Sequence, residues 1–215
     1  LVFVSQCTVC DPGKFCDSVG LSLPRGLCDP GYYCVLGAKS STPLSLPEGG
    51  LCTAGGYCEA GSSAPAACPP GTFNNVTGSK SAIDCQLCPA GYYCKDSAKP
   101  APTGPCSPGY YCTSGATTAQ QFVTPAGYFS ESGSSGPVPC EAGTYNPTTN
   151  ASFCPLCPAS FLCSNQSTVL YQSCPVGHYC PQGSYRAIAC SRGTFSNVPN
   201  LSSSSQCQTC TPGKY

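Results

Sequence analysis

The chain has 215 residues, of which 22 are cysteine; only 8% of its residues are charged and its formal net charge is zero. A cysteine content of about one residue in ten is typical of a disulfide scaffold, and the few scattered lysines and arginines exclude the basic face of a nucleic-acid-binding protein. Leucine, isoleucine, valine and phenylalanine are too scarce for an ordinary apolar core. We therefore expect disulfides to hold the fold together, mainly by restricting the unfolded chain.

One seven-residue frame recurs along the chain: cysteine, two residues, glycine, one residue, an aromatic residue and cysteine. Proline before the glycine, as in Pro30-Gly31, predicts a type II turn, because glycine adopts the positive φ of that turn without strain. The turn brings the two cysteines together. Regular copies run from Cys10 to Cys16, Cys28 to Cys34, Cys52 to Cys58, Cys88 to Cys94, Cys106 to Cys112 and Cys174 to Cys180, and a ragged copy from Cys157 to Cys163 has Ser160 for the glycine and Leu162 for the aromatic residue.

Four Cys-x2-Cys pairs divide the chain into longer repeat units. The pairs are Cys7/Cys10, Cys85/Cys88, Cys154/Cys157 and Cys207/Cys210. Near the end of each complete unit a lone cysteine opens the sequence Cys-x-x-Gly-Thr-aromatic, at Cys68, Cys140 and Cys190. We predict cysteine-rich repeat units at residues 1–84, 85–153 and 154–206, and the start of a further unit at residues 207–215.

The second unit lacks both cysteines of one frame together. The sequence Thr124-Pro-Ala-Gly-Tyr-Phe-Ser130 keeps the turn and the aromatic residues, with threonine and serine in the cysteine positions. Losing one partner alone would leave an unpaired thiol. The joint loss therefore indicates that the two cysteines of a frame pair with each other.

Two disulfide patterns agree with this spacing. The first closes each frame and each long loop, with the pairs Cys10–Cys16, Cys28–Cys34, Cys52–Cys58, Cys88–Cys94, Cys106–Cys112, Cys157–Cys163, Cys174–Cys180, Cys68–Cys85, Cys140–Cys154 and Cys190–Cys207. A rival pattern joins neighbouring frames crosswise, for example Cys88 to Cys106 together with Cys94 to Cys112, and the sequence does not decide between the two. Cys7 and Cys210 remain, and we expect disulfides from them to residues outside the segment.

The expected fold is a series of small disulfide-rich modules in tandem, mostly coil and turns with short β-hairpins and little or no helix. Proline or glycine interrupts the chain at short intervals, and no stretch shows sustained helical periodicity. We expect an elongated rod in which each module touches only its neighbours. Tyr32, Tyr92 and Tyr110 are candidates for contacts between modules or between chains. The other frame tyrosines are interpreted as lids over the disulfides, namely Tyr33, Tyr57, Tyr93, Tyr111 and Tyr179.

Disulfides in this number require an oxidising compartment, so we expect an extracellular or cell-surface protein. Four Asn-x-Ser/Thr sequons agree and predict N-glycosylation at Asn75, Asn150, Asn165 and Asn200. Asn75, Asn150 and Asn200 follow the three lone cysteines, so we expect their glycans to occupy equivalent loops and form a periodic row. The apolar stretches are too short to cross a bilayer, and we expect no membrane contact within this segment.

Cys-x2-Cys pairs also occur in zinc and thioredoxin-like redox sites. Here successive pairs begin 78, 69 and 53 residues apart, which is too far for a zinc ribbon, and the βαβ pattern of a redox site is absent. His178 is the only histidine and occupies a variable position of its frame, which favours ordinary surface placement over catalysis. The acidic residues show no calcium-loop spacing. We therefore expect no enzyme activity, no metal site and no cofactor.

The run Cys68-Pro-Pro-Gly-Thr-Phe73, its sequon loop, and Cys85-x-x-Cys-Pro-Ala-Gly-Tyr-Tyr-Cys94 resemble the ephrin-receptor-like cysteine-rich repeat, a relative of tumour-necrosis-factor-receptor modules. The likeness extends from Cys7 over nearly the whole chain. It implies elongated, disulfide-stapled extracellular modules, which occur both in receptors and in large surface proteins of algae and other protists, including mastigoneme-like proteins. Such modules serve both receptors and fibres, so the resemblance does not choose between them.

The sequence is therefore compatible with two functions. The first is a structural segment of a large secreted glycoprotein that forms an extracellular filament or surface coat of the mastigoneme-like kind. Its partners would be copies of itself or other chains of the same filament, together with covalent glycans, and no nucleic acid. The alternative is the ligand-binding ectodomain of a cell-surface receptor.

Overall fold

The computed structural model describes residues 8–44, 47–211 and 213. The chain separates into two compact units, of which the first comprises residues 1–104 and 114–118 and the second comprises residues 105–113 and 119–215. The division lies within one of the predicted repeat units. The bounds of the predicted repeat units therefore do not coincide with the two compact units and stay a prediction.

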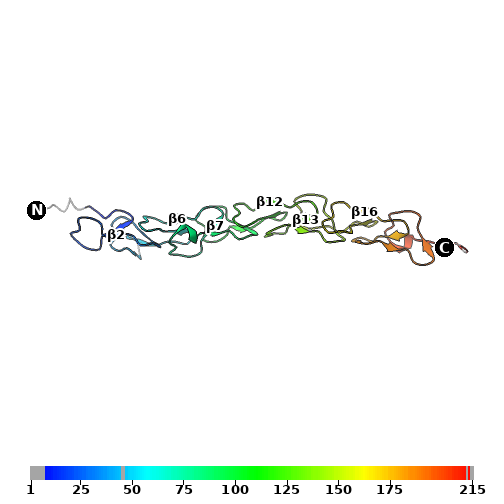
Figure 1. Cartoon of the computed structure of the whole chain (residues 1–215), viewed down its shortest axis with the longest axis horizontal. Coiled ribbons are helices and arrows are strands. Elements are labelled where there is room, and N and C mark those ends of the chain that lie inside the picture. Colours follow the sequence, from blue (N-terminus) through cyan, green and yellow to red (C-terminus); the bar gives the residue numbers. More distant parts are fainter. Residues whose placement is uncertain (1–7, 45–46, 212, 214–215) are drawn as a thin grey trace. The chain divides into compact units, whose positions relative to one another are not determined.

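The first unit is a series of two-stranded antiparallel hairpins, each of which begins directly after a frame glycine and returns just before the next frame (Figure 1). Its pairs are β1 (Lys14–Phe15) with β2 (Gly26–Leu27), β3 (Tyr32–Cys34) with β4 (Gly49–Leu51), β5 (Gly56–Tyr57) with β6 (Ala66–Ala67), and β7 (Thr72–Phe73) with β8 (Gln86–Leu87). The unit also contains the 3-10 helix η2 (Ala82–Asp84) and strand β9 (Tyr92–Tyr93), and β10 (Gly104–Pro105) begins at the last residue of its 1–104 segment.

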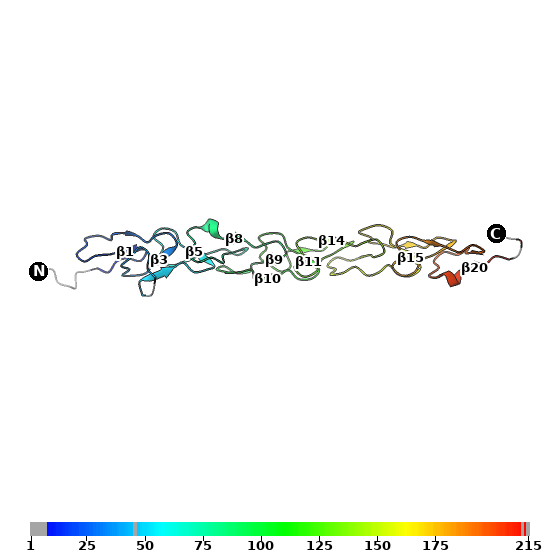
Figure 2. The same cartoon turned by 90° about the horizontal axis from the view of Figure 1, so that it is seen from below.

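The second unit repeats the same hairpin. Its pairs are β11 (Tyr110–Tyr111) with β12 (Phe122–Val123), β13 (Tyr128–Phe129) with β14 (Val138–Pro139), β15 (Phe161–Leu162) with β16 (Gln172–Ser173), β17 (His178–Tyr179) with β18 (Ile188–Ala189), and β19 (Thr194–Phe195) with β20 (Gln208–Thr209). A single bridge between Thr144 and Leu156 takes the place of one hairpin. The 3-10 helix η3 (Ser204–Gln206) precedes β20, and Figure 2 shows η2 and η3 as short coiled ribbons near β8 and β20. The described residues contain no α-helix, so the predicted fold class of tandem disulfide-rich hairpin modules is confirmed.

The frame glycine forms the turn that the sequence predicts. Gly31 has a φ of 93°, and the N–H of Tyr32 donates to the carbonyl of Asp29 at 3.1 Å. The positive φ at the third position and this closing hydrogen bond are the features of a type II turn. The turn reverses the chain between two cysteines and starts the first arm of the hairpin.

Successive frames are joined by the same two backbone hydrogen bonds at the frame glycine. The N–H of Gly13 donates to the carbonyl of Cys34, the last residue of the next frame, at 2.8 Å. The carbonyl of Gly13 accepts from the N–H of Cys28, the first residue of that frame, at 2.9 Å. Equivalent pairs of bonds occur at Gly31, Gly55 and Gly71 in the first unit and at Gly109, Gly127, Gly143, Ser160 and Gly177 in the second. The structural repeat is thus one frame with its loop, which is shorter than the predicted repeat units.

The frame glycine also lies against the frame after the next one. A Cβ placed on Gly31 would lie 2.6 Å from the carbonyl oxygen of Gly78, and one on Gly127 would lie 2.6 Å from that of Ser167. Such a distance is closer than a real Cβ contact allows. At the level of single frames, the backbone of the second neighbour therefore packs against this glycine. Both contacts lie within one predicted repeat unit or between adjacent units, so the expectation that each module touches only its neighbours stays a prediction.

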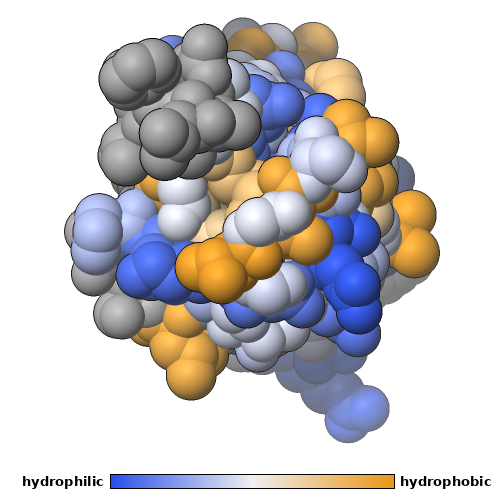
Figure 3. Space-filling model, turned by 90° about the vertical axis from the view of Figure 1, so that its left-hand side faces the viewer, coloured by the Kyte–Doolittle hydropathy of each residue, from blue (hydrophilic) through white to orange (hydrophobic). Residues whose placement is uncertain are grey.

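The core consists mainly of disulfides. Most frame cysteines have no exposed surface, and apart from glycines the other buried apolar residues among those described are Ala38, Pro43, Ala116 and Leu201. Phe15 and Tyr32 pack against the Cys28–Cys34 disulfide and Ala38. Phe15 comes from the preceding frame and so joins two successive frames, whereas Tyr32 belongs to the same frame as this disulfide, and its expected contact between modules stays a prediction. On the face drawn in Figure 3, apolar side chains are interspersed with polar ones. The structure therefore agrees with the expectation that cross-links replace an apolar core.

Candidate functional site

Ten disulfides form the framework, and they join the same pairs as the pattern that closes each frame. Seven lie within frames, with Cα atoms 5.8–6.1 Å apart, and the crosswise pattern is not formed. Three close the long loops, namely Cys68–Cys85, Cys140–Cys154 and Cys190–Cys207. Cys210 is free and half-buried, and Cys7 lies outside the described residues. The proposed partners of these two cysteines stay a prediction.

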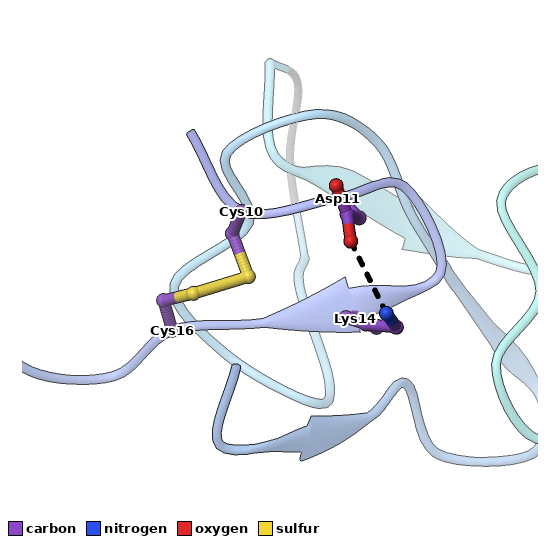
Figure 4. Close-up of polar contacts among 4 residues, drawn as sticks. All are labelled: Cys10, Asp11, Lys14 and Cys16. Atoms are coloured by element: carbon purple, nitrogen blue, oxygen red, sulfur yellow. Dashed lines mark hydrogen bonds and ion pairs between the residues drawn. A yellow bond between two sulfur atoms is a disulfide. The ribbon is translucent and has the colours of Figure 1, made fainter. Parts of the chain in front are cut away.

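Figure 4 shows the first frame, in which Cys10 and Cys16 meet across the turn. The Lys14 ammonium lies 3.1 Å from a carboxylate oxygen of Asp11 on the opposite arm. Both side chains are largely exposed, so this ion pair contributes at most about 1 kcal/mol. The disulfide and the turn, rather than the charges, determine the geometry of the frame.

Asparagine replaces the second cysteine of the frame in two of the long loops. Asn74 stands six residues after Cys68, is 1% exposed, and donates from Nδ2 to the carbonyl of Gly56 at 3.0 Å. Asn146 stands six residues after Cys140, is 3% exposed, and donates to the carbonyl of Tyr128 at 2.7 Å. Each side chain therefore links its frame to the preceding one. The sequence analysis missed both residues, although their fixed distance from the lone cysteine was a usable signal.

The frame without cysteines keeps the geometry of the others. The N–H of Gly109 donates to the carbonyl of Ser130 at 2.8 Å, and the N–H of Thr124 donates to the carbonyl of Gly109 at 3.0 Å. Thr124 and Ser130 are fully buried. Within the described part of the chain, neither hydroxyl has a hydrogen-bond partner. Thr124 and Ser130 therefore fill the space of the two cysteines, but neither a disulfide nor a side-chain hydrogen bond replaces the missing cross-link.

All four predicted glycosylation asparagines are exposed, but their backbones differ. Asn150 and Asn200 both have a φ of 65° and follow the last frame position by four residues. In the corresponding loop after Asn74 this position belongs to Gly78, with a φ of 73°, and not to Asn75. Asn150 and Asn200 are thus equivalent, whereas Asn75 lies three residues earlier in its loop. The three asparagines thus lie in corresponding loops, but only Asn150 and Asn200 occupy the same position within them, and the glycan row stays a prediction.

Asn165 and the other singled-out residues lie in ordinary surroundings. Asn165 is exposed in the loop after Cys163. His178 is half-buried in β17, with Nδ1 2.9 Å from the carbonyl oxygen of Val176. The frame tyrosines expected to act as lids are half-buried, and so is Tyr110, whereas Tyr92 is exposed. Among the described residues, no three histidine, cysteine or acidic side chains are grouped so that they could hold a metal ion.

Neither a membrane-spanning helix among the described residues nor a matching family model indicates a role for the chain. No helix within the described ranges has the length and apolar character needed to cross a membrane. No protein-family model matches the chain, and no curated protein matches it significantly. The framework itself remains informative, because many disulfides in small tandem modules indicate an extracellular protein.

Proposed function

We propose that the chain is a structural segment of a large secreted glycoprotein that builds an extracellular filament or surface coat. The observation that supports this most directly is the pair of backbone hydrogen bonds at each frame glycine. These bonds recur where the last frame residue is cysteine, asparagine or serine, as at Cys34, Asn74 and Ser130. An array joined through its backbone tolerates varied side chains and can be lengthened one frame at a time, as a spacer or filament requires.

The surface chemistry supports the same proposal. All four sequon asparagines are exposed, and only 8% of residues are charged, so that covalent sugars would supply much of the hydration that charged residues supply elsewhere. We propose that copies of the same chain or of other filament chains are its partners. The resemblance to ephrin-receptor-like repeats of large surface proteins points in the same direction.

We propose no catalytic role for the chain. Its one histidine contacts a backbone carbonyl two residues away, and the cysteines in the frames and long loops are bonded to each other. The residues that the repeats place in equivalent positions are turn glycines, disulfide cysteines and hydrogen-bonding asparagines. These are the residues of a scaffold.

Electron microscopy of the secreted full chain tests the function. A filament or lattice with a regular repeat that survives washing in high salt is expected, because the chain carries few charges that salt could screen. Monomers that stay dispersed at every concentration would contradict the proposal. Binding of such monomers to a soluble protein with saturable 1:1 stoichiometry would instead establish the receptor-ectodomain alternative.

A further inference from the structure

The loop closed by the Cys68–Cys85 disulfide contains a groove of about 450 Å³ beside the first sequon. The groove lies within the first unit, between the segment that follows the frame and helix η2. Its lining includes Asn74, Val76, Ser79, Lys80, Ile83 and Asp84. Asn75, the sequon asparagine, stands between two of these residues and is exposed.

The floor of the groove is formed before any ligand binds. Asn74 and Ser79 are 1% and 6% exposed, and the Nδ2 of Asn74 donates to the Oγ of Ser79 at 2.8 Å and to the carbonyl of Gly56 at 3.0 Å. The Oδ1 of Asn74 accepts from the N–H of Val76 at 3.1 Å. These bonds fix the backbone on both sides of Asn75.

Two apolar side chains of the lining are exposed. Ile83 in η2 is 90% exposed, and Val76 is 54% exposed. Asp84 holds the helix in place, because its Oδ2 accepts from the N–H of Lys80 at 2.7 Å and from that of Ser81 at 3.1 Å. A rigid turn that presents a bare isoleucine to water costs free energy unless something covers the isoleucine.

The chain contains an internal comparison in the loop closed by Cys190–Cys207. This loop has the same length, a 3-10 helix in the same place, and Gln206 accepting from two backbone N–H groups as Asp84 does. The position of Asn75 is taken by Asn197, whose Val-Pro continuation is not a sequon. The position of Ile83 is taken by Ser205. The exposed isoleucine thus accompanies a sequon at the position of Asn75 and is replaced by a hydrophilic residue where that position is not a sequon and the loop's sequon lies three residues later, at Asn200.

We propose that this groove binds the first sugar of the glycan attached to Asn75, an N-acetylhexosamine. The C–H face of the pyranose ring covers Ile83 and Val76, while its hydroxyl and acetamido groups meet Lys80 and Asp84. The inference rests on the proposal that the chain is a glycoprotein. In the attachment, Nδ2 of Asn75 forms a bond to C1 of a polyprenyl-pyrophosphate-linked oligosaccharide, the C1–O bond to pyrophosphate breaks, and one Nδ2 proton is released.

The test uses the full chain secreted from eukaryotic cells and trimmed with an endoglycosidase that leaves one sugar on each asparagine. Mass spectrometry first establishes the sugar on Asn75. Amide exchange over residues 76–84 is then compared with that of Thr77→Ala, which lacks this sugar, and we expect it to be about threefold slower with the sugar present. Nuclear Overhauser contacts between sugar ring protons and the Ile83 methyl groups are expected.

Two variants separate the groove from general effects. Ile83→Ser copies the loop that ends at Cys207 and should abolish the slowing while leaving Asn75 modified. Val19→Ser changes another fully exposed apolar residue in the first unit and should leave the slowing intact. A modified Asn75 with no contacts and no slowing would overturn the groove proposal alone, whereas an unmodified Asn75 would overturn it together with the glycoprotein proposal at this site.

Discussion

Thr124 and Ser130 stand at the first and last positions of one frame, both fully buried, in the place where the regular frames have a disulfide. Their hydroxyls have no hydrogen-bond partner among the described residues. The stretch between Cys112 and Cys140 is consequently the longest one in the described chain that no disulfide encloses. This frame is therefore expected to be the least stable part of the second unit.

Introducing the missing cross-link should stabilise this frame. The double variant Thr124→Cys/Ser130→Cys is expected to form a further disulfide and to raise the local stability by about 2 kcal/mol, the loop-entropy estimate for a seven-residue ring. Amide exchange over residues 125–139 measures the effect, because an array of modules does not unfold as a two-state system. Thr124→Val/Ser130→Ala is the control without a disulfide. It should be neutral or slightly stabilising because it removes two unpaired hydroxyls.

Asn74 and Asn75 are neighbours that should respond oppositely to substitution. In protein made without glycosylation in an oxidising compartment, Asn74→Ala should destabilise the first unit by about 1–3 kcal/mol, because buried hydrogen-bonding groups lose their partners. Asn75→Gln should change stability by less than about 0.5 kcal/mol, since its side chain is exposed. Amide exchange over residues 69–84 in both variants checks this. Equal losses would show that the buried hydrogen bonds of Asn74 are not what holds the frame.

Gly31→Ala should be more disruptive than alanine at another glycine of similar φ. Both Gly31 and Gly20 have a positive φ, which costs an alanine about 1–2 kcal/mol. A Cβ at Gly31 would in addition meet the carbonyl of Gly78, whereas nothing lies within 4 Å of one at Gly20. Amide exchange in the first unit should therefore show a loss of local stability at Gly31→Ala that exceeds the loss at Gly20→Ala by about 1 kcal/mol or more. Similar losses would mean that the second-neighbour contact has no energetic weight.

Asn150 should have a backbone role that is independent of its sugar. Its φ of 65° is a left-handed conformation that glycine and asparagine adopt more readily than other residues. In this conformation its backbone N–H donates to the carbonyl of Thr124 at 2.8 Å. Ser152→Ala should remove the glycan and leave unfolding of the deglycosylated protein unchanged. Asn150→Val should destabilise even unglycosylated protein by about 1–2 kcal/mol, and Asn150→Gly should not. Mass spectrometry and amide exchange over residues 141–153 separate the two roles, and equal stability of the valine and glycine variants would contradict the backbone role.

Residues that act over short distances were predictable. A frame disulfide closes a turn of seven residues, so the spacing of Cys28 and Cys34 and the glycine between them predict that the two cysteines lie close together, and only the structure excluded the crosswise pairing of neighbouring frames. The exposure of the sequon loops likewise follows from their polar composition. The pairing of Cys68 with Cys85 followed from the lone cysteine and the Cys-x2-Cys pair that comes next along the chain.

The sequence by itself determined that turns and disulfides, instead of an apolar interior, hold this protein together, because those interactions join residues that are close along the chain. Only the tertiary structure decided that the repeat is a single frame, that Asn74 and Asn146 complete frames by bonding the preceding frame, and that Gly31 meets Gly78. These contacts join residues 18 or more positions apart. Which residues meet depends on how successive frames stack. The stacking is made by backbone N–H and carbonyl groups, which leave no signature in the order of the side chains.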